Sequence, residues 1–165
     1  PYQAYIGRYF LFMVIGIIQA LVVCFGDLYI LKVQCLNPEL FVLAGVIASI
    51  VFINIIYTLV VSFGDVGKAI CVFLLVIQVA GAGGTFPVDV TPEFFQKINP
   101  YLPFTYAINS MRETIAGLYG DAYKTDITKL IAFLPSSLAL GLILRKPLIK
   151  INEFFEEKLE ETNLM

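Results

Sequence analysis

Few residues in this sequence are of types that could perform chemistry, and their spacing does not support a catalytic site. The stretch 64–69 resembles a phosphate-binding loop, but that loop requires a glycine and a hydroxyl residue where this chain has Ser62 and Ala69. Because the chain has no histidine, it cannot form a His-dependent serine site or an HExxH zinc site. Asp27 and Asp65 cannot form an aspartic dyad, since we expect them on the order of 30 Å apart along their helices. We therefore predict no catalytic, cofactor or metal site, and no enzyme.

The net charge and the cysteines exclude two further kinds of function, nucleic-acid binding and a disulfide or cysteine-metal framework. A net charge of −2 provides no basic field for nucleic acid, so no nucleic-acid partner is expected. Cys24 and Cys71 lie in apolar runs and Cys35 stands alone, which gives neither a disulfide framework nor a CxxC metal spacing. The glycines at 81–84 follow an apolar helix rather than a strand, so they indicate helix packing and termination, not a dinucleotide site.

Three amide side chains are the polar groups of most interest. Gln19, Asn54 and Gln78 lie one in each of the first three long apolar runs, about nine or ten residues from the end that we place on one side of the membrane. At 1.5 Å per residue they share one level, roughly 14 Å deep. Because an amide in lipid without a partner costs several kcal/mol, we expect all three to face protein. They either join helices by hydrogen bonds or line a translocation path.

Asp27 is an acid within the first apolar run, four residues before Leu31. An ionisable residue inside a membrane span is a functional candidate by default. The nearness of the span's end favours a structural role, with Asp27 solvated or assisted by Lys32. Both interpretations stay open at this point.

The elements that carry these residues are membrane helices. The chain is 59% hydrophobic and only 15% charged, against roughly 25% charged in soluble domains. Runs at 9–31 and 40–63 have 23 and 24 residues, above the ~20 needed to cross a bilayer, and runs at 69–86 and 127–144 have 18 each. Glycines should fray the end of the third run, and Pro135, followed by two serines, should bend the fourth. The sequence predicts an all-α membrane protein with four transmembrane helices.

The segment 87–126 is too long for a bare connection, so we expect it to be structured. Thr91 and Pro92 predict the N-cap and first position of a short helix over 91–98. Apolar residues at helical spacing from Phe104 predict a second helix over 103–118, which ends at Gly117. This pair would form a re-entrant or interfacial helical hairpin at the outer face.

The lysines and arginines of the flanking segments predict the orientation. Six of them fall on one side (Arg8, Lys68, Arg145, Lys146, Lys150 and Lys158) and four on the other (Lys32, Lys97, Arg112 and Lys124). We therefore expect both ends and the 64–68 turn in the cytoplasm. The tail 145–165 should form an amphipathic helix whose acidic face favours a protein partner or solvent over anionic lipid.

One stretch carries a family resemblance. Its residues are Gly83, Gly84, Pro87, Pro92, Asn99, Pro100, Pro103, Tyr106, Asn109 and Arg112. At these positions the sequence resembles the C-terminal part of ABC type-2 membrane domains, and within that group the YhgE/Pip proteins of Gram-positive bacteria. The resemblance implies a six-span fold of which this chain holds about the last four, with residues 87–120 as the outer hairpin.

The same resemblance implies two functions of different classes. One is a permease-like domain for export across the bacterial cytoplasmic membrane, with a separate ATPase subunit and a homodimer as its assembly. The other is a non-transporting envelope anchor or receptor module, involved in phage adsorption or accessory to type VII secretion. Since the chain opens at Pro1 without Met, we expect 1–165 to be the C-terminal part of a polytopic domain, whose other partners are membrane lipid and the upstream part of the same protein.

Overall fold

The structure is a computed structural model that describes residues 2–140 and contains only helices and connections in that range. Its elements are α1 (Tyr2–Phe25), the π-helical turn η1 (Gly26–Ile30), α2 (Pro38–Gly81), the 3-10 turn η2 (Val88–Val90), α3 (Glu93–Ile98), the 3-10 turn η3 (Asn99–Tyr101), α4 (Pro103–Ala116) and a helix over residues 122–140. The predicted all-α class is confirmed. The predicted end of the last run, at 141–144, and the tail 145–165 lie outside the described residues.

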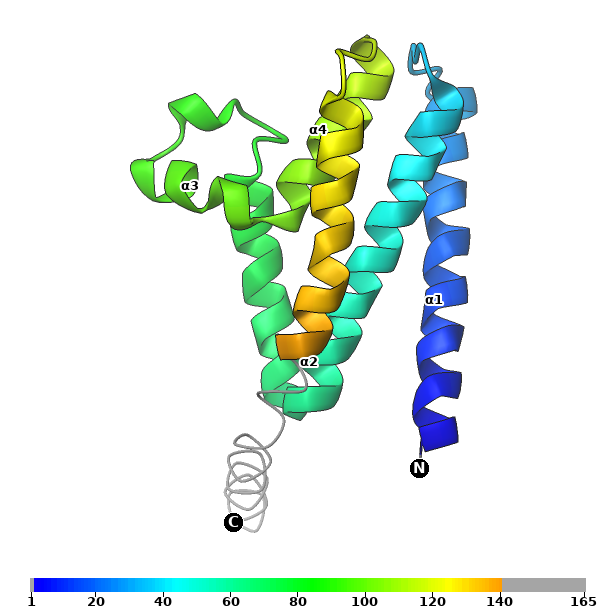
Figure 1. The fold of residues 1–165 in the computed structure, drawn as a ribbon, viewed down its shortest axis with the longest axis vertical. Coiled ribbons are helices and arrows are strands. Elements are labelled where there is room, and N and C mark those ends of the chain that lie inside the picture. Colours follow the sequence, from blue (N-terminus) through cyan, green and yellow to red (C-terminus); the bar gives the residue numbers. More distant parts are fainter. Residues whose placement is uncertain (1, 141–165) are drawn as a thin grey trace.

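The helix α2 reverses direction at Gly64. This residue has φ 57° and ψ −129°, a conformation open to glycine, and Figure 1 shows the chain turning back there. A Cβ at Gly67 would collide with the carbonyl oxygen of Leu59, so a second glycine is needed for the close approach. We predicted a tight turn over 64–68 and a third helix over 69–86. Instead the helix resumes at once and ends at Gly81, because Gly83, with φ 75°, leaves the helical conformation.

The reversal carries one exposed ion pair. The Lys68 ammonium lies 2.7 Å from the Asp65 carboxylate. Pairs exposed to this degree contribute little to stability, because water and salt screen them. The glycines, rather than this pair, therefore define the turn.

The helix α1 lies at one edge of the bundle beside the first half of α2 (Figure 1). Two glycines permit this contact: a Cβ at Gly16 would collide with Ile53, and one at Gly45 with the Cys24 sulfur. We predicted a first span over 9–31. The helix begins earlier, at Tyr2, and its last turn widens into η1 at Gly26.

The hydrophobic core lies where α2, α4 and the 122–140 helix meet. Val51, Ala107 and Leu130 form its centre and are at most 4% exposed. The Tyr123 hydroxyl donates a hydrogen bond of 2.9 Å to the Leu40 carbonyl and joins the upper ends of two helices. The last helix begins at 122, earlier than the predicted 127, and continues through Pro135 to the end of the described range.

Two of the described helices are long and apolar enough to cross a membrane, over Ile6–Ile30 and Pro38–Gly81. Only 11% and 28% of their most apolar stretches are buried inside the protein. A core helix of a soluble protein would be mostly buried. The exposed apolar surface of these helices therefore fits a lipid environment.

We expect Gly64→Ala to destabilise the protein by about 1–3 kcal/mol, because alanine is strained at this backbone conformation. Thermal unfolding of the full-length protein in detergent measures the effect. Gly7→Ala is the matched control, since Gly7 lies in α1 with open space around it and should tolerate alanine. Equal melting temperatures for both variants would contradict the strained turn.

Candidate functional site

Asn54 is the polar centre of the bundle. Its side chain is 1% exposed, and its Oδ1 accepts a hydrogen bond of 3.0 Å from the Tyr9 hydroxyl. Its Nδ2 donates to the Ser137 hydroxyl at 2.6 Å and to the Leu134 carbonyl at 3.3 Å. One amide thus joins α1, α2 and the 122–140 helix.

Two buried hydroxyls continue from Asn54 along the same face of α2. Thr58 and Ser62 follow at four-residue spacing, and each is 7% exposed. The Thr58 hydroxyl oxygen is buried without a hydrogen-bond partner among the described residues. Thr58 also lines a cavity of about 240 Å³ together with Ser136 and Ser137, and the other walls of this cavity are apolar. We did not predict this polar column, although its i, i+4, i+8 spacing is visible in the sequence.

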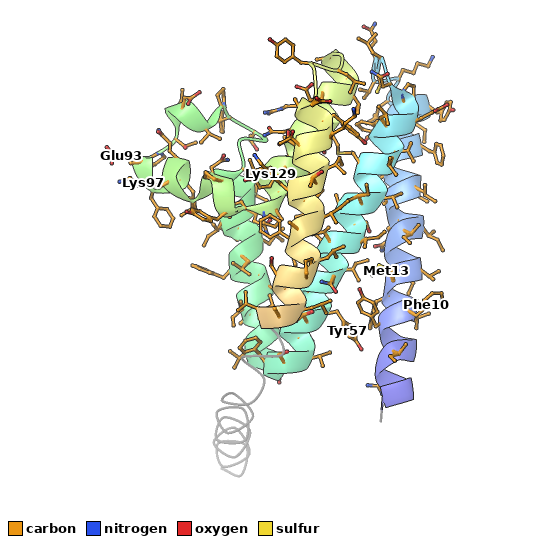
Figure 2. The ribbon with its side chains drawn as sticks, in the orientation of Figure 1. Phe10, Met13, Tyr57, Glu93, Lys97 and Lys129 are labelled. Atoms are coloured by element: carbon orange, nitrogen blue, oxygen red, sulfur yellow. The ribbon has the colours of Figure 1, made fainter. Side chains whose placement is uncertain are left out.

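Aromatic side chains close the contact between α1 and α2 next to Asn54. The rings of Tyr9 and Tyr57 lie 5.2 Å apart at 60°, and Tyr57 also lies 6.0 Å from Phe12. Figure 2 shows Tyr57 in the space between α2 and α1. The amide of Asn54 is therefore enclosed by ring surface on the α1 side.

Gln78, near the end of α2, bonds to the backbone of α4 rather than to side chains of the bundle centre. It is 7% exposed, and its Oε1 accepts a hydrogen bond of 3.2 Å from the backbone N–H of Phe104. Phe104 is the second residue of α4, so this N–H has no partner within its own helix. Gln78 thus caps α4 from a distance of 26 residues along the chain.

The carbonyls at the end of α2 are capped in return by Asn99 and Arg112. The Asn99 amide donates to the Gly81 carbonyl at 2.8 Å and to the Thr105 hydroxyl at 3.0 Å. The Arg112 guanidinium donates to the carbonyls of Gly83 at 2.6 Å and Gly84 at 3.3 Å. Four residues of the family-like stretch therefore lock α4 onto the end of α2.

The prolines of that stretch begin its short helices. Pro87 and Pro92 precede η2 and α3, and Pro103 is the first residue of α4. The predicted N-cap at Thr91 is wrong, because the Thr91 hydroxyl donates to the Val88 carbonyl and Pro92 occupies the cap.

The other two polar residues of the stretch behave differently. The Tyr106 hydroxyl donates a hydrogen bond of 2.5 Å to the Pro100 carbonyl and so links α4 to η3. The Asn109 side chain is half-buried on α4 and has no hydrogen bond within the described range. Tyr106 therefore has a structural contact that Asn109 lacks.

The three amides do not meet. Asn54 lies ten residues before Gly64 and Gln78 fourteen after it, so their heights differ by about 6 Å at 1.5 Å per residue. We counted from the two ends of a predicted turn over 64–68, whereas the helix resumes directly after Gly64, which explains the expected common level. Gln19 is exposed on α1 and has no hydrogen-bond partner among the described residues.

Asp27 lies half-buried in η1, where its backbone carbonyl accepts from the Val33 N–H at 3.0 Å. Lys32 has a positive φ of 52° in the following turn. No ion pair joins the two side chains in the part of the chain that the structure describes. The Lys32-assisted role that we considered has no support in these contacts.

Lys129 is a charged residue that we overlooked within the predicted fourth run. Its ammonium lies 5.2 Å from the centre of the Tyr106 ring, and that ring lies 6.2 Å from the Phe133 ring. A cation over an aromatic face gains about 0.5–2 kcal/mol. This contact offsets part of the cost of placing a lysine in an apolar helix.

Comparison with known proteins gives two matches. Residues 1–144 match the family described as ABC-2 family transporter protein. The chain is also similar to the uncharacterized protein YhgE of Bacillus subtilis (strain 168), with 34% identity over 115 residues that make up 70% of this chain. The chain spans only 15% of the length of that relative. No solved structure matches the chain.

We expect Asn54→Leu and Ser137→Ala to be coupled in a double-mutant cycle by about 0.6–2 kcal/mol, because each removes one side of the same hydrogen bond. Thermal unfolding of the full-length protein in detergent gives the four stabilities. Ser136→Ala is the matched control, since the Ser136 hydroxyl donates to Ala132 within its own helix. Equal coupling with Ser136 and Ser137 would contradict the assigned bond.

Proposed function

The chain belongs to the ABC-2 family of transporter proteins, and from this premise we propose that it is the permease-like part of an exporter in the bacterial cytoplasmic membrane. The observation that carries the proposal is the family match over residues 1–144, which includes every helix of the described range. The long apolar helices α1 and α2, whose apolar surface is mostly exposed, support the membrane location.

The proposed membrane domain has four spans. They are α1, the two halves of α2 at 38–63 and 65–81, and the helix at 122–140. The shortest of them, 65–81, has the ~17 residues that can still cross a bilayer. Figure 1 shows these four segments running alternately up and down, with the Gly64 reversal and the start of α1 at the same end. Arg8 and Lys68 lie near that end, and we assign it to the cytoplasm.

We propose that the segment from Gly83 to Leu102 lies at the outer membrane interface. Figure 1 shows α3 projecting sideways from the bundle, away from the Gly64 end. Phe94 and Tyr101 are 59% and 77% exposed, while Glu93 and Lys97 form an exposed pair at 3.5 Å (Figure 2). An amphipathic segment of this kind is suited to the boundary between lipid and water.

A partner must supply the energy for export. We propose that a separate ATPase subunit supplies it, as the family suggests, since the stretch 64–69 lacks the residues of a phosphate-binding loop and offers no nucleotide site itself. Two copies of the membrane domain would accompany it as a homodimer. Both partners are what the family suggests and belong to this proposal.

One observation favours the second candidate, a non-transporting envelope anchor or receptor module. The buried amides Asn54 and Gln78 both direct their hydrogen bonds to protein groups. Such bonds hold helices together without requiring a polar path. The relative also extends far beyond the matched residues, which leaves room for an extracellular receptor part.

ATP hydrolysis tests the exporter proposal. The full-length protein is purified from bacterial membranes with its bound subunits and placed in lipid vesicles. We expect an ATPase subunit to copurify and to hydrolyse ATP above the level of empty vesicles. If neither occurs, the export proposal fails and the anchor is favoured.

The variant Asn54→Leu then separates the roles of the amide. If Asn54 holds the helices together, hydrolysis falls only in proportion to the amount of assembled complex. If Asn54 lines a path, hydrolysis or transport per assembled complex changes as well. Ser136→Ala provides the control that should leave both quantities unchanged.

A further inference from the structure

The cavity beside Thr58 lies next to a polar atom that the described contacts do not satisfy. It measures about 240 Å³ and lies between the two halves of α2 and the 122–140 helix, which contribute Leu59, Leu74 and Phe133 to its walls. Thr58 also lines it, and this residue is 7% exposed. Its hydroxyl oxygen is buried and has no hydrogen-bond partner in the part of the chain that the structure describes.

A buried hydroxyl without a partner destabilises a fold, because it loses its bonds to water and gains none in return. Thr58 lies six residues before Gly64, or about 9 Å along the helix from the reversal, so lipid surrounds the bundle at this level. A valine would fill the same space as Thr58 without an unpaired hydroxyl. The threonine is therefore favourable here only if a molecule in the cavity pairs with it.

Ser137 provides a second polar group at the same cavity. Its hydroxyl donates to the Leu134 carbonyl at 3.0 Å and accepts from the Asn54 amide at 2.6 Å. A hydroxyl has one donor and two acceptor positions, so these two bonds leave one acceptor position of Ser137 unused. The cavity thus has a donor at Thr58 and an acceptor at Ser137.

We infer that this cavity is a binding site for water, and that a bound water accepts a hydrogen bond from Thr58 and donates one to Ser137. A water molecule takes about 30 Å³ in the liquid and needs at least two polar partners, and the cavity meets both conditions. An acyl chain would suit the apolar walls but would leave Thr58 unpaired.

The bound water extends the polar centre of the bundle. The Tyr9 hydroxyl donates to Asn54, and the Asn54 amide donates to Ser137. A water between Ser137 and Thr58 carries this network from α1 along α2 toward the Gly64 turn. The inference goes beyond the proposed function, since it holds whether or not the protein transports.

Radiolytic footprinting of the full-length protein in lipid nanodiscs tests the inference. X-ray pulses convert bound water into hydroxyl radicals, which oxidise the side chains next to it, and mass spectrometry locates the oxidised residues. Phe133 lines the cavity, whereas the control Phe73 is 66% exposed and lies outside it. We expect more oxidation at Phe133 than at Phe73. Oxidation of Phe133 no higher than that of Phe73 would overturn the inference and indicate a dry cavity or one filled by an acyl chain.

Substitution of Thr58 tests the assigned partner. Thr58→Val keeps the volume but removes the hydroxyl, so oxidation of Phe133 should fall to the level of Phe73 and the melting temperature should fall. Thr58→Ser keeps the hydroxyl and should retain most of the oxidation. Unchanged oxidation of Phe133 in Thr58→Val would overturn the assignment. A higher melting temperature of Thr58→Val would overturn it as well, because removal of a truly unpaired hydroxyl stabilises the protein.

Discussion

The interior of a membrane-spanning bundle cannot rely on water to satisfy its polar groups, and this constraint explains most of the contacts in the structure. Asn54 uses both ends of its amide, and its partners come from α1 and from the 122–140 helix. If these helices packed in a different register or order, the Asn54 amide would lose its partners. An unpaired buried amide costs several kcal/mol, more than several apolar contacts contribute. The position of one asparagine therefore helps to determine which helices are adjacent.

The same constraint operates at the ends of the helices. The last carbonyls of α2 and the first N–H groups of α4 lack partners within their helices. Asn99 and Arg112 satisfy the carbonyls, and Gln78 satisfies an N–H. The two halves of α2 thus belong to different polar centres, and Gly64 connects them.

The sequence predicts much of this fold because its signals are local. Run lengths, the glycines after Gly81 and the apolar face of 103–118 locate the helices, although the predicted bounds differ by five to seven residues at the start of α1, the end of α2 and the start of the last helix. The turn at 64–68 was predicted, but its tightness was not, since hydropathy does not show that the helix resumes directly after Gly64. The contact between Gln78 and the Phe104 N–H joins distant residues, and no local pattern reveals it. Lys129 was overlooked because apolar neighbours dominate its run.

The central claim is that four helices cross the membrane and place the Gly64 turn and the α4 end on opposite sides. Cysteines introduced at Val66 and at Tyr119, which is 83% exposed, test it in full-length protein without its native cysteines. In intact cells a thiol reagent that cannot cross the membrane should label position 119 and not 66, and opened membranes should allow both to react. Labelling of 66 in intact cells, with or without 119, would contradict the account.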